Sequence, residues 1–543
     1  MIDGKTAELS SPLKKVHLDP HRMICSKQGL QGFFWPISPD EYQTLRDVFI
    51  SSLVKKLRRR LTKQQECDAT LILILLFHLT IEMMGTYQAT TIRRRAEKQG
   101  CNVLFPKYGR LWPFIFTGKP PSYPPLIAEL SKGPSVPSRL RLPARYLRSF
   151  IIRDGFRRYH RTRNSLTQEI YCISTGPLLE QHAKTSERKA NYAGLHHWFY
   201  PVEDGEPAKT SVIEDVLESL DEAFKAGNEV LEPWIRDYFL QWITKGTALV
   251  RTHLTRLSDK PESLPSHLWT GSGAQIWARI LRCAVKKHGG IVTGHDHGIG
   301  AGHIEDRTKT IRDFEFCDTF ITFTKGQVSS LKQNFYPPYL IQPNRPHIRH
   351  IPSSPLPIPS GLQKKGKKQR KNRKRVLYLS QISEGEIVHL MPFMPDPVFL
   401  DWVTRVLVRL VETGFETYWK PHPTARIGPS DQFINSHAIR QANKSLRKAA
   451  EQADVLLIDN HQTTSFAEIQ ALPIPIVLID FGLRPLLPRA RSLINSRCQM
   501  VSGWFDDNNQ AQTNWKSMHS ALQNAQTLGS LGFANEYLST FSA

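Results

Sequence analysis

The sequence predicts an α/β fold with two Rossmann-like domains that face each other across a cleft. Three observations predict it: short apolar runs alternate with helical stretches in both halves, polar loops follow these runs, and a polar linker separates the halves. Such alternation is typical of parallel sheets with crossover helices, which bind ligands at the carboxyl ends of their strands. The length of 543 residues also favours several domains, roughly two to four.

The composition indicates a globular chain that is expected in the cytoplasm. Apolar residues make up 40%, enough for sizeable cores. Seven scattered cysteines without a CxxC pair argue against a disulfide framework and against a thiolate metal site. The first residues lack the pattern of a signal peptide. The most apolar segment, 70–84, is shorter than a membrane span needs, and we expect a buried strand that runs into a helix.

The charge indicates an anionic partner, although it also serves solubility. The net charge is +23 and the pI is about 9.7, which suits nucleic acid, an anionic membrane face or phosphorylated substrates. No RNP-like aromatic pattern, zinc finger or helix-turn-helix is evident in the sequence, so nucleic acid is disfavoured. An enzyme with nucleotide substrates beside an anionic membrane fits at least as well.

The first half is expected to begin with helices and to continue as a sheet domain. A helix over 39–60 with a basic end is predicted to pack on the protein, with membrane-surface attachment as the alternative. A β–α–β pattern follows, without a GxGxxG fingerprint, and resumes after a helical insertion. The predicted elements are a strand at 71–77, a helix at 87–98, a strand at 102–105, inserted helices at 212–226 and 232–257, a strand at 268–270, a helix at 274–287, and strands at 291–293 and 318–323.

The second half repeats the alternation after a Pro/Ser and then Lys/Arg-rich linker, which cannot pack into a core. Its predicted strands are 376–379, 417–419, 455–458 and 476–479, and its predicted helices are 397–412, 436–453, 466–472 and 515–542. The expected domains are an N-terminal helical extension (1–66), an N-terminal Rossmann-like domain (67–351) with a helical insertion at about 109–262, the linker (352–375), and a C-terminal Rossmann-like domain with C-terminal helices (376–543).

The first candidate site is the glycine- and histidine-rich loop at 294–303. Glycines let backbone amides approach a ligand, and His295, His297 and His303 offer a base or phosphate-binding donors. The loop glycines of interest are Gly294, Gly298 and Gly300. A metal site is an alternative, although the spacing matches no recognised zinc framework. A glycine turn with solvated histidines is another.

The second candidate site is Lys420-Pro421-His422-Pro423. The prolines restrict the backbone on both sides of His422. Lys420 and Arg426 add positive charge that suits a pyrophosphate or a phosphate leaving group. The alternative is an incidental loop histidine.

The third candidate site is the loop at 459–468, which begins with Asp459. Thr463, Thr464 and Ser465 are able to cap the next helix or to bind phosphate with its free N–H groups. Glu468 closes a capping box with Ser465 or holds a ribose. The sequence leaves both alternatives open.

Together these loops resemble those of GT-B superfold transferases that build bacterial surface polymers, especially poly(glycerol phosphate) glycerophosphotransferases and related O-antigen and capsule transferases. The likeness covers roughly residues 264–480. It rests on a His-Gly motif, a His-Pro motif and a polar strand-to-helix loop. The matching residues are His297-Gly298, His422-Pro423, Asp459, Thr463, Thr464, Ser465 and Glu468.

The resemblance implies that 67–351 is an acceptor domain and 376–543 a nucleotide-donor domain. It implies an enzyme with His297 as the base that activates an acceptor hydroxyl. His422 would contact the donor phosphate, and the hydroxyls at 463–465 would bind it. It further implies a nucleotide-activated sugar or glycerol donor, CMP- or CDP-linked, and a glycan or lipid-linked acceptor. The basic charge adds the expectation that the enzyme works in the cytoplasm at the inner face of the membrane. We expect no cofactor, and no metal because no DxD-like pair is placed to hold one. The alternatives are a sugar-nucleotide 2-epimerase of the same superfold and a non-catalytic protein that binds polyanions or anionic lipid.

Overall fold

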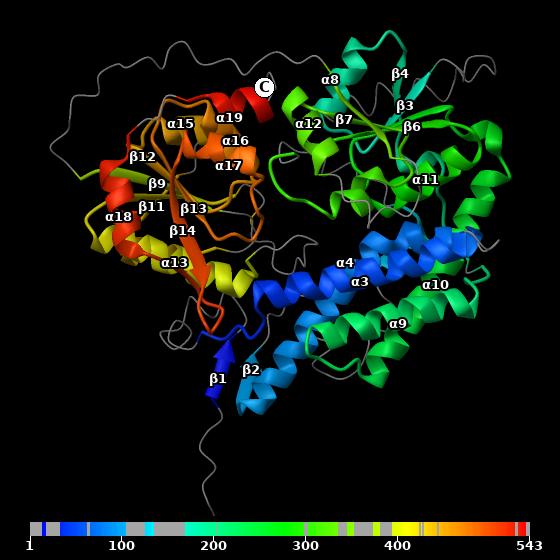
Figure 1. The fold of residues 1–543 in the computed structure, drawn as a ribbon, viewed down its shortest axis with the longest axis horizontal. Coiled ribbons are helices and arrows are strands. Elements are labelled where there is room, and N and C mark those ends of the chain that lie inside the picture. The colour runs from blue at the N-terminus through cyan, green and yellow to red at the C-terminus, as the bar shows by residue number, and fades with distance from the viewer. Residues whose placement is uncertain are drawn as a thin grey trace, which may run out of the picture.

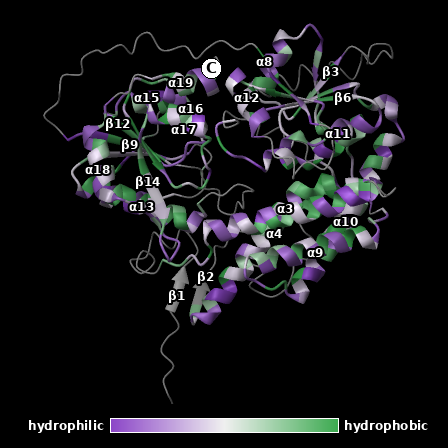
Figure 2. Ribbon diagram, viewed as in Figure 1, coloured by the Kyte–Doolittle hydropathy of each residue, from purple (hydrophilic) through white to green (hydrophobic). Residues whose placement is uncertain are grey.

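The structure is a computed structural model with two sheet domains, one on each side of the predicted linker, and a layer of long helices from the N-terminal part of the chain (Figure 1). The predicted α/β class with two Rossmann-like sheets is confirmed. The central strands of the two sheets are more hydrophobic than their edge strands (Figure 2). The described residues are 14–17, 33–61, 66–104, 125–134, 169–203, 205–297, 302–334, 345–351, 373–380, 394–422, 425, 428–442, 445–526 and 530–538.

The first sheet has six parallel strands in the order β4-β3-β5-β6-β7-β8. Because the chain steps from β3 out to β4 and then returns to the other side of β3, the order reverses between β3 and β5, which defines a topological switch point. The strands are β3 (Ile170–Ile173), β4 (Ala190–Tyr192), β5 (His267–Thr270), β6 (Ile291–His295), β7 (Thr319–Thr322) and β8 (His347–His350), with helices α8 (Pro177–Thr185), α11 (Ile276–Lys287) and α12 (Lys325–Gln333) between them.

The second sheet has the order β11-β10-β9-β12-β13-β14-β15, with only the last pair antiparallel. Its first six strands in chain order follow the 3-2-1-4-5-6 arrangement of Rossmann folds, so the switch point lies between β9 and β12. The elements are β9 (Arg375–Leu379), α13 (Asp396–Glu412), β10 (Glu416–Lys420), β11 (Arg440–Gln441), β12 (Val455–Ile458), α16 (Thr464–Gln470), β13 (Ile476–Asp480), α17 (Pro488–Asn495), β14 (Gln499–Phe505), β15 (Ala511–Thr513), α18 (Trp515–Asn524) and α19 (Gly532–Tyr537).

The long helices form a layer beside the first sheet. Helix α3 (Pro39–Leu61) packs on α9 (Thr210–Ala226) and on α4 (Glu66–Lys98), and α4 also packs on α10 (Pro233–Ser258) and α11. α10 in turn contacts the short helix α6 (Pro125–Lys132). The predicted helices at 39–60, 212–226 and 232–257 are thus confirmed. The helical insertion expected at 109–262 is only partly helical, because β3 and β4 fall inside it.

Helix α4 corrects the strand predicted at 71–77. Its apolar run is surrounded by α3, α10 and α11, so every residue from Ala69 to Leu76 is buried. Because no side of this run is exposed, its sequence lacks the alternation of polar and apolar residues that indicates a helix. By length and hydropathy α4 is the one helix among the described residues that is able to cross a membrane, but 78% of its apolar window is buried inside the protein. Its neighbours therefore account for its apolar character.

Two further predictions change. The strand expected at 102–105 is β2 (Cys101–Leu104), but it pairs with β1 (Lys14–His17) in a separate two-stranded sheet. The helix predicted at 436–453 is replaced by α14 (Asp431–Ser436), β11 and α15 (Leu446–Ala450). The other predicted strands of the second half match β9, β10, β12 and β13 to within one residue at either end, because each is a buried apolar run bounded by polar loops.

Candidate functional site at the facing sheet edges

The carboxyl edge of the first sheet is tightly packed at its switch point. Ile173 and Thr270 are register partners, and Ser174 follows with a φ of 50°. A Cβ at Gly271 would lie 2.0 Å from the backbone oxygen of Ser174, so only glycine fits there. This close approach brings the loops after β3 and β5 together at the place where doubly wound sheets bind ligands.

His297 lies at this switch point, two residues after β6, and its side chain is exposed. A Cβ at Gly176 would lie 3.9 Å from His297 Nδ1. Gly176 is the N-cap of the nine-residue helix α8 and no side chain caps it, with Pro177 as the first helical residue. The imidazole thus stands beside a helix N-terminus, where the helix dipole favours negative charge.

A buried ion pair fixes the backbone just before His297. Lys309 Nζ lies 3.0 Å from Asp296 Oδ1 and 3.5 Å from Asp313 Oδ2, and all three side chains are at most 7% exposed. Burial lowers the pKa of Lys309, but the two carboxylates outweigh that effect and raise it above its usual value. The strand end that carries His297 is therefore held by charged groups with no access to water.

Gly294 and His295 were predicted in the ligand-binding loop, but both belong to β6 and are buried. A Cβ at Gly294 would meet Cys317 Sγ at 2.9 Å, so this glycine serves packing. His295 Nε2 lies 2.9 Å from His182 Nδ1, and its Nδ1 lies 3.3 Å from the Thr270 oxygen. Burial lowers the pKa of His295 well below its usual value. Neither residue is placed to contact a ligand in the loop.

The carboxyl edge of the second sheet carries Lys420 and Glu468. Register pairs Lys420 with Leu379 and Leu379 with Ile458, so the ends of β10, β9 and β12 lie abreast, about 5 Å apart per strand. Burial lowers the pKa of Lys420, and the Glu468 carboxylate opposes this effect. Partial burial of the otherwise exposed Glu468 likewise raises the pKa of its carboxyl group, and the Lys420 charge opposes this effect. The two charged side chains therefore interact with each other at the carboxyl edge of the second sheet.

Asp459 lies at the β9–β12 switch point, but its visible partners belong to the protein. Oδ2 accepts hydrogen bonds from the Tyr378 hydroxyl and from Trp402 Nε1, the latter at 2.9 Å. Oδ1 is buried without a hydrogen-bond partner among the described residues. Burial raises the pKa of Asp459 to about 6 although both hydrogen bonds lower it. The carboxyl group therefore ties β9, β12 and α13 together and titrates near neutral pH.

Replacing Asp459 with asparagine should change how stability depends on pH. Asn Oδ1 is able to accept both hydrogen bonds while the charge is removed. Because the folded pKa is raised from 3.8 to about 6, the wild type binds more protons folded than unfolded, so its free energy of unfolding falls as pH rises from about 4 to above 6. Across this pH range the free energy of unfolding of the wild type should fall by about 3 kcal/mol relative to that of Asp459→Asn. Urea unfolding from pH 4 to 8 measures it, with exposed Asp507→Asn as control; parallel curves would contradict it.

Helix α16 begins two residues earlier than it would if Ser465 were its N-cap. Thr463 is the N-cap of α16, and its Oγ1 accepts from the Phe466 N–H at 3.1 Å. The capping alternative is therefore correct for Thr463, while the capping box between Ser465 and Glu468 is wrong. Ser465 and Glu468 lie on the first two turns of α16, half-buried and exposed respectively. Thr464 is the first helical residue.

His422 lies two residues beyond β10 and is half-buried. Its backbone oxygen accepts from the Ala425 N–H at 3.0 Å, which forms a turn after Lys420-Pro421. The turn keeps His422 at the same carboxyl edge as Lys420. The predicted site residues Arg426, Gly298 and Gly300 lie outside the described residues.

The two carboxyl edges face each other, and their loops touch. The Leu487 N–H donates to the His303 oxygen at 3.0 Å, and the Glu305 N–H donates to the Pro485 oxygen at 2.9 Å. His303 comes from the loop after β6, and Pro485 and Leu487 come from the loop after β13. Helix α19 also reaches α12 of the first domain, where Gln327 Nε2 donates to the Tyr537 oxygen at 3.0 Å. These contacts fix the orientation of the two domains.

His303 has a different place from the one predicted. It is 2% exposed and packs against His461, with ring centroids 5.9 Å apart, and against Phe533 and Tyr537. Burial lowers the pKa of both histidines to about 3. They are neutral parts of the domain interface, so neither is a base that exchanges protons with solvent. No cluster of three or more potential metal ligands was found among the described residues.

Sequence reasoning missed the start of α8 and the Asp296–Lys309 pair. Proline at the first helical position is typical of helix starts, so Gly176-Pro177, which follows β3 after Ser174 and Thr175, carried a usable signal. It was overlooked because this stretch was assigned to the helical insertion. The pairing of Asp296 with Lys309 depends on a fold of the chain between them, which no local pattern shows.

No protein-family model matches the chain, and no curated protein matches its sequence. Among solved structures, the chain is similar to the apo form of the lipopolysaccharide outer core galactosyltransferase WaaB, with 10% identity, a TM-score of 0.30, and coverage of 57% of this chain and 80% of that one. It is also similar to apo D-mandelate dehydrogenase from Rhodotorula graminis, with 10% identity, a TM-score of 0.16, and coverage of 62% and 80%. Similarities this distant leave the function to the chain's own residues.

Proposed function

We propose that this chain is a transferase that moves a sugar or glycerol-phosphate unit from a nucleotide-activated donor to a hydroxyl group of a growing cell-surface polysaccharide. One observation carries the proposal: the carboxyl edges of two doubly wound sheets face each other, with His297 at one and Lys420 at the other. Ligands of such sheets bind outside the carboxyl ends of the strands. Two substrates are thereby expected between the same two edges.

In the proposed reaction His297 acts as the general base. A ring nitrogen takes the proton of the acceptor hydroxyl while its oxygen attacks the donor carbon or phosphorus. The bond from that atom to the nucleotide phosphate breaks, and the nucleotide leaves with the bonding electrons. The open N-terminus of α8 beside His297 favours the negative charge that develops.

The second edge is proposed to hold the nucleotide donor. The ammonium group of Lys420 neutralises the leaving phosphate, and His422 at the same edge donates a hydrogen bond to it. Glu468 accepts from the ribose hydroxyls. The hydroxyl of Ser465 contributes to phosphate binding, while Thr463 caps α16. The nucleotide is a cytidine, CMP- or CDP-linked. No metal takes part, and the chain works at the inner face of the membrane.

Replacing Lys420 with alanine tests the donor edge. Loss of its charge should weaken the binding of CDP and UDP about tenfold, or about 1.4 kcal/mol. Calorimetric titration at constant salt measures it. Lys448→Ala is the matched control, since Lys448 is an exposed lysine of α15 in the same domain. Equal affinities of wild type and Lys420→Ala would contradict the proposed donor site.

The alternative functions predict different products. A 2-epimerase would convert the nucleotide sugar without an acceptor, and a binding protein would show no turnover.

A further inference from the structure

The loop after β6 docks onto the second sheet domain through residues 302–305. Ile304 forms an antiparallel bridge with Leu486 from the loop after β13. The backbone hydrogen bonds of His303 and Glu305 described above flank this bridge. Ile304 and Leu486 are both buried and belong to the apolar core of the second sheet domain. A short segment of the first domain is therefore held by the second.

Two buried histidines lie side by side at this docking contact. His303 of the first domain is 2% exposed, and His461, from the loop after β12, is 6% exposed. Their ring centroids are 5.9 Å apart. Phe533 and Tyr537 of α19 also pack against the ring of His303, with centroids 5.4 and 6.2 Å away. The two imidazoles are thus enclosed where the two domains meet.

The enclosed rings are poorly suited to carry a positive charge. Neither ring nitrogen of His303, nor Nδ1 of His461, has a hydrogen-bond partner among the described residues. A protonated imidazole donates through both nitrogens, so protonation would leave buried N–H groups without acceptors and would bury a charge. Burial lowers the pKa of both histidines to about 3 and outweighs the opposing effect of nearby backbone groups.

The charged groups closest to the pair disfavour protonation further. Arg484, from the loop after β13, lowers the pKa of both histidines, and Arg491 of α17, which pairs with Asp480 at 2.9 Å, lowers that of His461. The anion on this side is Asp306. Burial raises its pKa, but neighbouring cations that include Arg484 outweigh burial and keep the pKa below its usual value. Asp306 therefore stays charged and is compensated by arginines.

The other elements at this contact bring groups that are neutral or paired. A Cβ at Gly302 would lie 2.9 Å from Gln327 Cα, so α12 meets this loop with a neutral residue. On α19, Glu536 pairs with Arg489 of α17 at 3.1 Å. Burial raises the pKa of Tyr537, so its hydroxyl is neutral. Of the groups named around this contact, the two histidines are those expected to change charge in mild acid.

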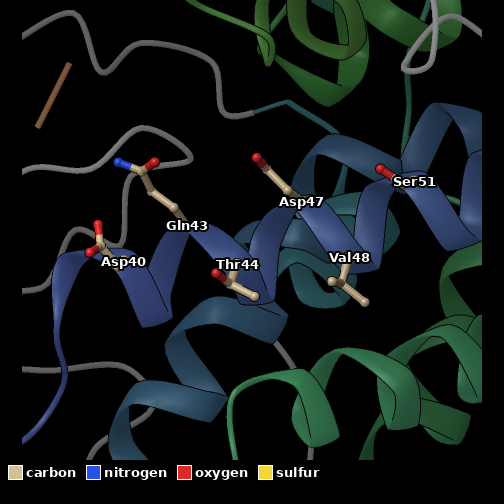
Figure 3. Close-up of a pocket in the computed structure, with 6 residues that line it drawn as sticks. All are labelled: Asp40, Gln43, Thr44, Asp47, Val48 and Ser51. Atoms are coloured by element: carbon tan, nitrogen blue, oxygen red, sulfur yellow. The ribbon is translucent and has the colours of Figure 1, made fainter. Parts of the chain in front are cut away.

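The contact of these loops with α3 is looser. A pocket of about 490 Å³ lies along α3, and its described lining includes Gln43 and Asp47 (Figure 3). Gln43 Nε2 donates to the Leu483 oxygen at 3.4 Å, and Arg307 Nη1 donates to Asp47 Oδ2 at 3.4 Å. Both hydrogen bonds are long, so they hold the loops only weakly. Loss of the histidine contact would leave little to keep the loops joined on this side.

We propose that His303 and His461 form an acid-sensitive latch, which holds residues 302–305 on the second sheet domain at neutral pH and releases them when the pH falls. The proposal concerns how the two domains are held together, so it does not depend on the proposed function.

The size of the effect follows from proton linkage. Histidines that are released into water titrate near their ordinary pKa of about 6.5. The docked state therefore binds fewer protons than the released state, and acid favours release. Between pH 7.5 and 5.5 each histidine should favour release by about tenfold, and the two together by about a hundredfold.

Hydrogen–deuterium exchange of the full chain at pH 7.5 and 5.5, followed by mass spectrometry and corrected for the intrinsic exchange rate, tests the latch. The reporters are the Glu305 and Leu487 amides, which donate across the contact. On acidification their protection should fall about a hundredfold in the wild type, but only about tenfold in His303→Phe and in His461→Phe. His288→Phe, at an exposed position away from the contact, is the control and should behave like the wild type.

Three results would overturn the latch. The first is unchanged protection of both amides in the wild type, and the second is the same hundredfold fall in His303→Phe and His461→Phe. The third is an equal loss of protection in peptides from β5 and β12, because acid would then unfold the domains rather than release the loop. If one variant fails to fold, as judged by circular dichroism, the other variant still decides.

Discussion

Replacing His297 with alanine should lower the rate of group transfer by about 10²–10⁴-fold, because a positioned general base contributes that much to a proton transfer. His297 is exposed beside Gly176 and the N-terminus of α8, so its loss removes no core contact. The thermal midpoint should therefore stay the same. Steady-state assays of nucleotide release, with and without acceptor, measure the effect, and kcat should fall far more than the affinity for the donor changes.

His288 provides the control for this variant. It is also exposed but lies before β6, at the amino edge of the same sheet, where its Nε2 is 3.1 Å from Ser258 Oγ. His288→Ala should retain full activity because nothing at that edge is proposed to bind a substrate. Equal activity of His297→Ala and wild type would remove His297 from the reaction.

Replacing Lys309 with methionine should destabilise the fold by about 3–5 kcal/mol, because it leaves Asp296 buried without its cation, whereas Asp313 keeps its ion pair with Arg312 at 2.9 Å. Methionine is similar in length, so the loss reflects charge rather than a cavity. Urea unfolding followed by circular dichroism measures it. Lys287→Met, at an exposed position at the end of α11, should change the free energy of unfolding by less than about 0.5 kcal/mol. A similarly small effect at Lys309 would contradict the assigned role of the buried pair.

The parts of the fold that could be predicted are those in which local pattern and tertiary environment agree. β12 is a run of four buried apolar residues between polar loops, and it was found at its observed bounds. The run at 70–84 has the same composition but is covered on all sides by other helices. Burial of a whole helix circumference erases the 3.6-residue period, so the sequence did not distinguish this helix from a strand.

The candidate site could be predicted only in so far as residues follow strands directly. Lys420 and His422 were located because each comes within two residues of the end of β10. His295 and His303 were grouped with His297 by proximity in sequence, but one points into the sheet and the other joins the domain interface. His295 is buried because it belongs to strand β6, and the place of His303 is set by its contact with His461. The contact with His461 joins residues more than a hundred positions apart, so no local pattern predicts it.

The most direct test of the proposed transferase is a nucleotide-release assay on the full chain. The protein is incubated with CDP-glycerol and with CMP-, CDP-, UDP- and GDP-linked sugars, a glycan acceptor and EDTA. The freed nucleotide and the extended glycan are quantified by mass spectrometry. Equal amounts of freed nucleotide and extended glycan are expected for at least one donor in the presence of EDTA, and both products should be lost in His297→Ala. Neither product from any donor, or products that form only after Mn²⁺ or Mg²⁺ is added back, would contradict it.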